Sequence, residues 1–204
     1  MRILIAALLL SACSQAAPAD AVPATLREDG QVVSWGTDCP AVEAVYALDG
    51  APGFTAGFRA TPDGYQSARD HLFWVRSEDT GRTYWFGFSI STGYGGVFAI
   101  PQAGPDVLTN PADEPDGSEN GVSLYPMGFD GAVGYEPPQG EGADAPPLIF
   151  APELGPVLAY NVEGYGGTER ERMPRALFRL VRCGDRPVAW AADQPLLTAP
   201  PAAD

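Results

Sequence analysis

Hydrophobic positions, many of them aromatic or β-branched, are most concentrated in the centre of the chain. Two runs rich in aromatic and β-branched residues, 71–76 and 83–90, flank the turn-like segment Glu78-Asp79-Thr80-Gly81. Such runs around a glycine-containing turn are typical of an antiparallel hairpin. Similar runs predict a strand over 54–60 before the hairpin and another over 96–100 after it, ended by Pro101. We expect these strands to form the folding centre.

Shorter elements are predicted on both sides of this centre. Asp38 can cap a short helix over 41–48, and Pro40 suits its first turn. Further strand candidates are 122–125, 128–135, 148–150 and 156–162. Segment 175–183 fits either a helix, by the spacing of its arginines, or a strand, by the run Phe178-Arg179-Leu180-Val181. We favour the strand because the chain is rich in strand patterns.

These elements predict the fold class. The chain contains 24 glycines and 21 prolines, which we interpret as turns between many short strands. We therefore expect a mainly β protein, namely a single antiparallel β-sandwich or partly closed barrel with one or two short helices.

The first thirteen residues follow a different pattern. Arg2 precedes an apolar run, Ile3 to Leu10, and the chain then continues through Ser11 and Ala12 to Cys13. A positive start, an apolar stretch and small residues are typical of a secretory signal. With a cysteine at its end, the segment Leu10-Ser11-Ala12-Cys13 resembles the lipobox of bacterial lipoproteins.

The resemblance implies a location. Residues 1–12 would be removed as a signal peptide, and Cys13 would carry acyl chains, palmitate among them, that anchor the protein in a membrane of the bacterial cell envelope. Ser14 in place of an aspartate favours the outer membrane, with the protein facing the periplasm. The alternative is an ordinary signal peptide cleaved after Ala17 or Ala19.

The chain after the signal peptide divides into three parts. Residues 13–30 are rich in Ala and Pro and predict a flexible tether. Residues 31–192 are long enough for one β-rich domain with its own core, and 193–204 predict a disordered tail.

The remaining cysteines are Cys39 and Cys183. The lipoprotein resemblance implies an oxidising compartment, where disulfides persist, so we expect these two residues to be joined. Two buried free thiols are the alternative.

Composition excludes several functions. The formal net charge is −14, which disfavours nucleic acid as a partner. All 12 basic residues are arginines, so the chain has no lysine for a Schiff base or a phosphate-binding Walker loop. His71 is the only histidine, which excludes a two-histidine zinc site. No cofactor is expected.

A possible ligand cleft is predicted from His71, Tyr94, Tyr165, Arg170 and Arg172. The two tyrosines lie in repeated Gly-Tyr-Gly-Gly segments, which we interpret as tight turns, with anion-facing loops as the alternative. His71 follows Asp70 and could act as a base, although a structural role is favoured.

Arginines 170, 172, 175, 179, 182 and 186 follow a segment, 83–169, that contains no basic residue. They could bind phosphates of lipid A or carboxylates of peptidoglycan by forked hydrogen bonds. Internal salt bridges to Glu169, Glu171 and Asp185 are the favoured interpretation. Asp113, Asp116 and Glu119 form a weak calcium candidate, and a solvated acidic loop is favoured over a metal site there.

No catalytic residues are predicted. We expect a non-catalytic binding or structural role in the envelope, with an unidentified glycan or protein partner. One alternative is a hydrolase that acts on envelope glycan through two carboxylates. The other is an acidic inhibitor of a basic lytic enzyme such as lysozyme.

Overall fold

Four consecutive strands form the centre of one sheet in the computed structural model, as the hydrophobic pattern predicts. Each strand is antiparallel to the next, in the register Phe58↔Phe73, Phe73↔Phe86 and Phe88↔Ala99. The strands are β4 (Ala51–Ala60), β5 (His71–Ser77), β6 (Thr83–Ile90) and β7 (Val97–Gln102).

The structure describes residues 25–26, 32–62, 70–90, 97–102, 104–105, 121–134, 136–140, 142–162 and 168–188. The predicted signal peptide, most of the predicted tether and the predicted tail lie outside these residues. Within the predicted tether, β1 (Thr25–Leu26) pairs with β2 (Val32–Ser34) in a separate two-stranded sheet.

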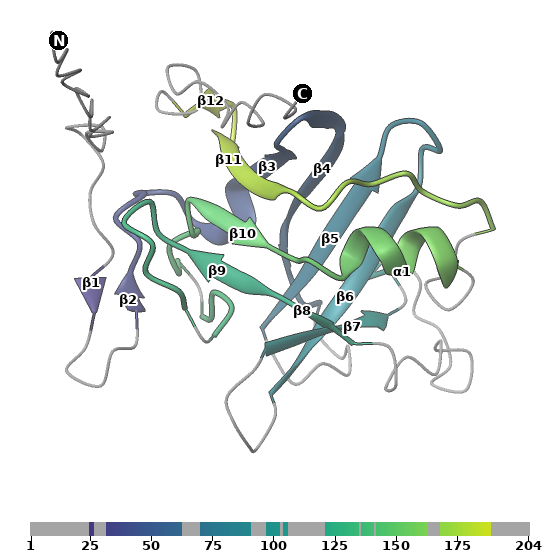
Figure 1. Ribbon diagram of the computed structural model, residues 1–204. Helices are drawn as coiled ribbons and strands as arrows, with labels where there is room; N and C mark the ends of the chain where they lie inside the picture. Colours follow the sequence, from purple (N-terminus) through teal and green to yellow (C-terminus); the bar gives the residue numbers. More distant parts are fainter. Residues whose placement is uncertain are drawn as a thin grey trace, which may run out of the picture.

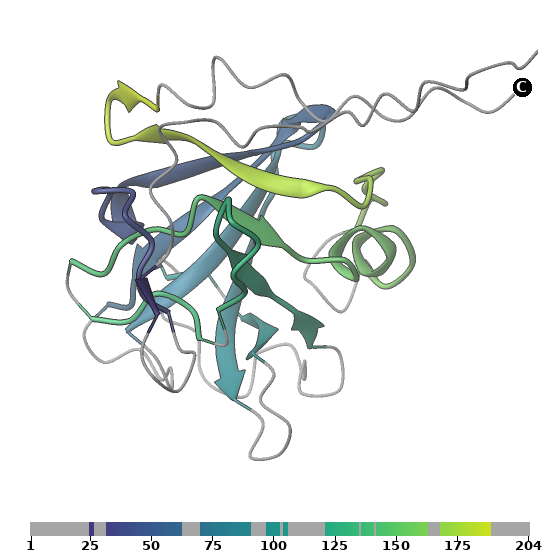
Figure 2. The same cartoon turned by 60° about the vertical axis from the view of Figure 1, so that its left-hand side comes forward.

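Shorter strands extend the central sheet at both ends. Next to β4 the order is β3 (Ala44–Leu48), β11 (Leu177–Cys183), β10 (Leu148–Phe150) and β9 (Tyr125–Met127), while β8 (Val122–Ser123) lies beside β7 and β12 (Arg186–Pro187) pairs with β11. Only Leu124 separates β8 from β9, so one continuous segment supplies both ends of the sheet. The ten-stranded antiparallel sheet therefore nearly closes into a barrel (Figures 1 and 2), which confirms the predicted fold class.

The interior of the barrel is filled by aromatic side chains. Alternate residues of a strand point to the same face, and Phe58, Phe73 and Phe86 share the inner one. The ring centroids of Phe58 and Phe73 are 5.5 Å apart, and those of Phe73 and Phe178 on β11 are 6.4 Å apart. Because β4 and β3 separate β5 from β11 in the sheet, the second contact crosses the interior. The centre of the barrel is thus a packed core.

The helix predicted over 41–48 is wrong beyond its first residues. Only Ala41–Glu43 form a helical turn, the 3₁₀ helix η1, and the chain then continues as β3. The side chains of Ala44, Tyr46 and Leu48 are buried at every second position, and the Tyr46 hydroxyl donates a hydrogen bond to the Pro146 carbonyl at 2.8 Å. The period of two that the core requires outweighs the local capping pattern.

The strand predicted over 156–162 is also wrong, because this segment belongs to α1 (Leu154–Tyr160), the α-helix of the described chain. Leu154 and Leu158, four residues apart, are both buried on one face of it. Pro156 lies in the first turn, where a helix does not need its missing N–H.

The strand predicted over 128–135 is wrong. The described residues form a turn, with the Gly128 N–H bonded to the Ala132 carbonyl at 2.8 Å, and Val133 makes an isolated β-bridge with Met127. Strand β7, which was predicted to end before Pro101, passes through this proline to Gln102. Strand β8 pairs with β7 only at Phe98 and Ala99, so one side of β7 has no ladder at Pro101 and tolerates a residue without an N–H. The segment 175–183 is a strand from Leu177 onward, as favoured.

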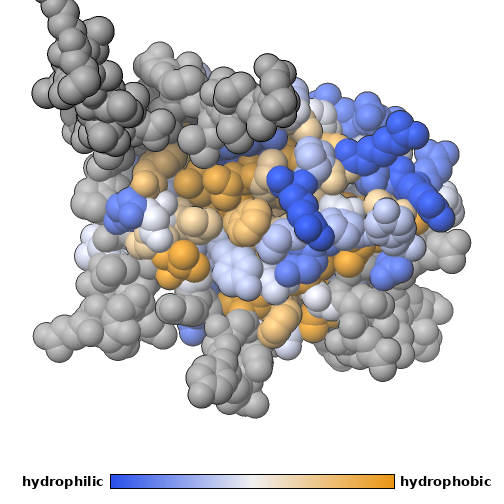
Figure 3. Space-filling model, in the orientation of Figure 1, coloured by the Kyte–Doolittle hydropathy of each residue, from blue (hydrophilic) through white to orange (hydrophobic). Residues whose placement is uncertain are grey.

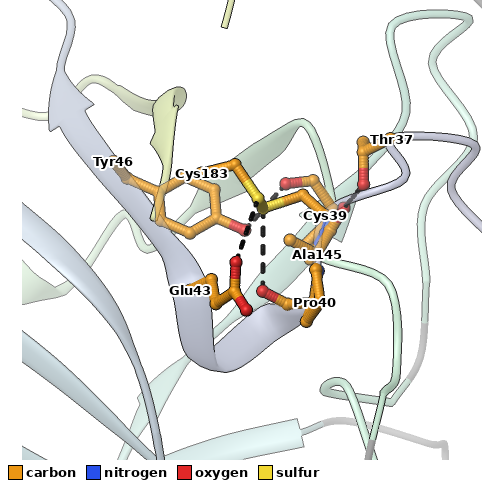
Figure 4. Close-up of a disulfide and its surroundings, with 8 residues drawn as sticks. Thr37, Cys39, Pro40, Glu43, Tyr46, Ala145 and Cys183 are labelled. Carbon is orange, nitrogen blue, oxygen red and sulfur yellow. Dashed lines mark hydrogen bonds between the residues drawn. A yellow bond between two sulfur atoms is a disulfide. The ribbon is translucent and has the colours of Figure 1, made fainter. Parts of the chain in front are cut away.

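Cys39 and Cys183 form a disulfide, as predicted (Figure 4). Their Cα atoms are 5.8 Å apart although 144 positions separate them in sequence. Cys183 is the last residue of β11 and pairs with Ala44 at the start of β3. The Glu43 carboxylate lies 4.0 Å from Cys183 Sγ. The bond therefore fastens the start of the barrel to its last long strand.

Removal of this disulfide should destabilise the barrel substantially. The chain-entropy model gives a stabilisation of about 5 kcal/mol for a loop of this length, which is an upper figure. In urea unfolding, the Cys39→Ala/Cys183→Ala double variant should have a lower midpoint than the oxidised protein. Fully reduced wild-type protein should match the double variant. Equal midpoints for oxidised wild type and the double variant would contradict a stabilising role.

Candidate functional site

The segment that leads into β11 alternates between buried and exposed residues. Glu171 is only 2% exposed and Met173 is also buried, whereas Arg170 and Arg172 are exposed. Alternation is expected of an extended chain with one face against the protein. Two arginines are thereby directed outward on either side of a buried glutamate.

Glu171 accepts hydrogen bonds from three hydroxyl groups of the β5–β6 hairpin. Ser77 Oγ, at the end of β5, is 2.8 Å from Oε2. Thr80 Oγ1 in the turn and the Tyr84 hydroxyl on β6 are 2.6 Å and 2.7 Å from Oε1. A buried carboxylate needs such partners because it has lost its contact with water. We call Glu171 with these three hydroxyl donors the Glu171 clamp.

The hydroxyl of Tyr84 is affected by the same environment. Burial raises the pKa of Tyr84 well above its usual value, and the hydrogen bond to Glu171 and the negative charge of Glu171 raise the pKa further. Tyr84 therefore remains a proton donor throughout the neutral range. It is suited to holding Glu171 and not to proton transfer.

Helix α1 holds the other side of the segment. The Glu171 N–H donates to the Leu158 carbonyl at 3.2 Å. Gly155 packs so closely on the Met173 carbonyl that a methyl group in its place would collide with that oxygen. The segment is thus fixed between the helix and the hairpin, which gives Arg170 and Arg172 a rigid base.

The predicted salt bridges to Glu169, Glu171 and Asp185 are not found among the described residues. Glu171 binds hydroxyls, and the buried Arg179 instead pairs with Asp49, with Nη2 and Oδ2 3.1 Å apart. In the described part of the chain, Arg170 and Arg172 form no ion pair within 4.0 Å. Arg82 donates to Thr168 Oγ1 at 2.7 Å. Figure 3 shows strongly hydrophilic residues gathered on the right-hand side, where this segment passes the helix in Figure 1.

His71 lies at the opposite end of β5 from the Glu171 clamp. Ser77 follows His71 by six positions, which corresponds to about 20 Å along a strand. The structure therefore does not bring His71 together with Arg170 and Arg172, although one cleft was predicted for all three.

The side chain of His71 is 4% exposed, and its Nδ1 has no hydrogen-bond partner among the described residues. Burial lowers the pKa of His71, while nearby Asp70 and a hydrogen bond to the Pro138 backbone raise it to a lesser degree. These features fit the structural role that was favoured for this residue.

The other predicted site residues lie outside the described residues. They are Cys13, Tyr94, Tyr165 and the weak calcium candidates Asp113, Asp116 and Glu119. Among the residues that are described, no three His, Cys, Asp or Glu side chains are grouped so as to hold a metal ion.

Sequence reasoning missed Ser77, Thr80 and Tyr84 as partners of Glu171. The alternating order Arg170-Glu171-Arg172-Met173 could have indicated an extended segment with a buried glutamate. Its partners could not be found in the same way, since they are separated from Glu171 by 94, 91 and 87 positions.

Comparisons with known proteins leave the family open. No family model matches the chain, and neither a curated protein nor a solved structure is similar to it. Within the described residues, every helix is too short or too polar to cross a membrane.

Removal of the Glu171 side chain should lower the free energy of unfolding. Glu171→Ala leaves three hydroxyls without their acceptor, and we expect a loss of roughly 3–5 kcal/mol in the free energy of unfolding. Arg172→Ala, next to it but exposed, should change the stability by less than about 0.5 kcal/mol. Urea unfolding of both variants measures the difference, and similar stabilities would show that the clamp contributes nothing.

His71 should make stability depend on pH. Its pKa in the folded protein is lowered, so the unfolded chain, with a value of about 6.5, binds the proton more readily. Stability should therefore fall as the pH drops from about 7.5 through 6.5 and below. His71→Gln, which keeps a side-chain N–H, should show a smaller fall in urea midpoint over that interval. An equal or larger fall in the variant would contradict this assignment.

Proposed function

We propose that this protein is an acyl-anchored lipoprotein of the bacterial envelope that faces the periplasm and has a non-catalytic binding role. The observation that carries the proposal is the Cys39–Cys183 disulfide. Disulfides persist in oxidising compartments and are rare in the cytosol. The disulfide supports the export that the segment Leu10-Ser11-Ala12-Cys13 implies.

Acylation of Cys13 is the means of attachment in this proposal. Two or more acyl chains hold a protein stably on a membrane, whereas one chain gives only marginal binding. Ser14 supports transfer to the outer membrane.

The hydrogen bonds of the buried Glu171 carboxylate favour a binding role over catalysis. A carboxylate hydrolase needs an acid with an oxygen free to exchange a proton or attack the substrate. Both oxygens of Glu171, the buried carboxylate of the described residues, already accept hydroxyl hydrogen bonds. The interior of the barrel is occupied by aromatic rings, so a ligand would bind on the outer surface.

Replacement of Cys13 tests the attachment. In the native host, Cys13→Ser should abolish labelling with radioactive palmitate and shift the protein from the membrane to the soluble envelope fraction. Ser14→Ala leaves the tetrapeptide intact and should remain labelled and membrane-bound. Continued membrane retention of Cys13→Ser, or an unlabelled wild type, would contradict the proposal.

A further inference from the structure

Arginines from two distant parts of the sequence lie at one end of the barrel. Arg76 and Arg82 flank the β5–β6 turn, and the Glu171 clamp brings that turn against the segment that carries Arg170, Arg172 and Arg175. We call these five residues the arginine end. Because residues 83–169 contain no basic residue, the cluster arises only through folding.

Four of these arginines have side chains without a partner among the described residues. Arg76, Arg170, Arg172 and Arg175 are exposed, and none of their guanidinium groups forms an ion pair or hydrogen bond in the described part of the chain. Arg170 and Arg172 are two positions apart in an extended segment, so their Cα atoms are about 7 Å apart and both side chains point outward. Two neighbouring guanidinium groups repel each other, and a bound carboxylate relieves that repulsion through forked hydrogen bonds.

The arginine end faces away from the point where the amino-terminal chain joins the barrel. Ser34 on β2 donates to Asp144 Oδ2 at 2.6 Å, and the neighbouring Ala145 N–H donates to the Cys39 carbonyl at 2.7 Å. The chain therefore enters beside the disulfide. Strand β11 separates the disulfide from Arg175 by more than six residues, or about 20 Å. The arginine end therefore lies at the other end of β11 from the disulfide.

Acidic side chains lie among these arginines. Glu78 and Asp79 in the β5–β6 turn and Glu169 beside Arg170 are all exposed. A uniformly negative membrane surface would be repelled by these carboxylates. A polymer that carries both carboxylate and ammonium groups complements the mixed surface.

We propose that the arginine end binds the carboxylate groups of cell-wall glycopeptide, with Arg170 and Arg172 as the principal contacts. The identity of the polymer rests on the proposed envelope location, because peptidoglycan is the abundant polymer there with both carboxylates and amines. The clamp serves this site by holding the two arginines in place before binding, which reduces the entropy lost on association.

The test is co-sedimentation of the purified full chain, in mild detergent, with isolated insoluble peptidoglycan. The wild type should sediment, and Arg170→Gln/Arg172→Gln should raise the Kd by about tenfold or more, the effect of losing about 1.4 kcal/mol of charge-assisted contacts. Arg182→Gln/Arg186→Gln is the matched control. It removes the same charge from two exposed arginines at the β11–β12 turn, beside the disulfide, and should change the Kd less than about twofold.

Four results would overturn the proposal. If the wild-type protein stays in the supernatant, peptidoglycan is not its partner. If both double variants lose the same affinity, the loss reflects net charge and not a contact of Arg170 and Arg172. Tighter binding to anionic phospholipid vesicles than to peptidoglycan assigns the surface to a membrane. Amidation of the peptidoglycan carboxylates should abolish sedimentation, and unchanged binding would also contradict the proposed contact. Because the assay needs no acylation, its result is independent of the Cys13 experiment.

Discussion

The packing of phenylalanine rings inside the barrel is the constraint on which the rest of the structure depends. Phe58, Phe73 and Phe86 come from three adjacent strands, and Phe178 reaches them from the far side of the interior. These rings are screened from water only if the sheet curves around them and its two ends meet. The segment 122–127 achieves this by supplying both ends of the sheet. A filled interior leaves the outer surface and the barrel ends for function.

One of those ends is organised by a single buried carboxylate. Glu171 joins the β5–β6 hairpin to a segment about ninety residues later in the chain. Its burial is unfavourable unless its hydrogen bonds are made, so the segment has essentially one stable position. The positions of Arg170 and Arg172 on either side of Glu171 are fixed as a result. In this sense a stabilising contact of the fold also defines the proposed binding surface.

The sequence predicted what is periodic and local. The strands around 71–76 and 83–90 lie in runs rich in aromatic and β-branched residues, and the structure confirms them together with the strand at 54–60. Only two cysteines remain besides Cys13, so the Cys39–Cys183 pairing had no competitor within the domain. Local capping around Pro40 predicted a helix that the core converts to β3, and the four-residue spacing of Leu154 and Leu158 was missed beside Pro156. The Glu171 clamp depends on contacts across the fold. Sequence positions alone give neither the contacts of the Glu171 clamp nor the separation of His71 from the arginines.

The disulfide also determines how mechanical load passes through the molecule. A pull exerted between the amino-terminal side of Cys39 and Arg172 crosses the sulfur–sulfur bond and then follows β11 backward for eleven residues. More than a hundred residues of barrel lie outside this covalent route. Tension along it bypasses the covalent chain of residues 40–171, so a pull at these two points can lengthen only the segment 172–183 before the disulfide bears the load.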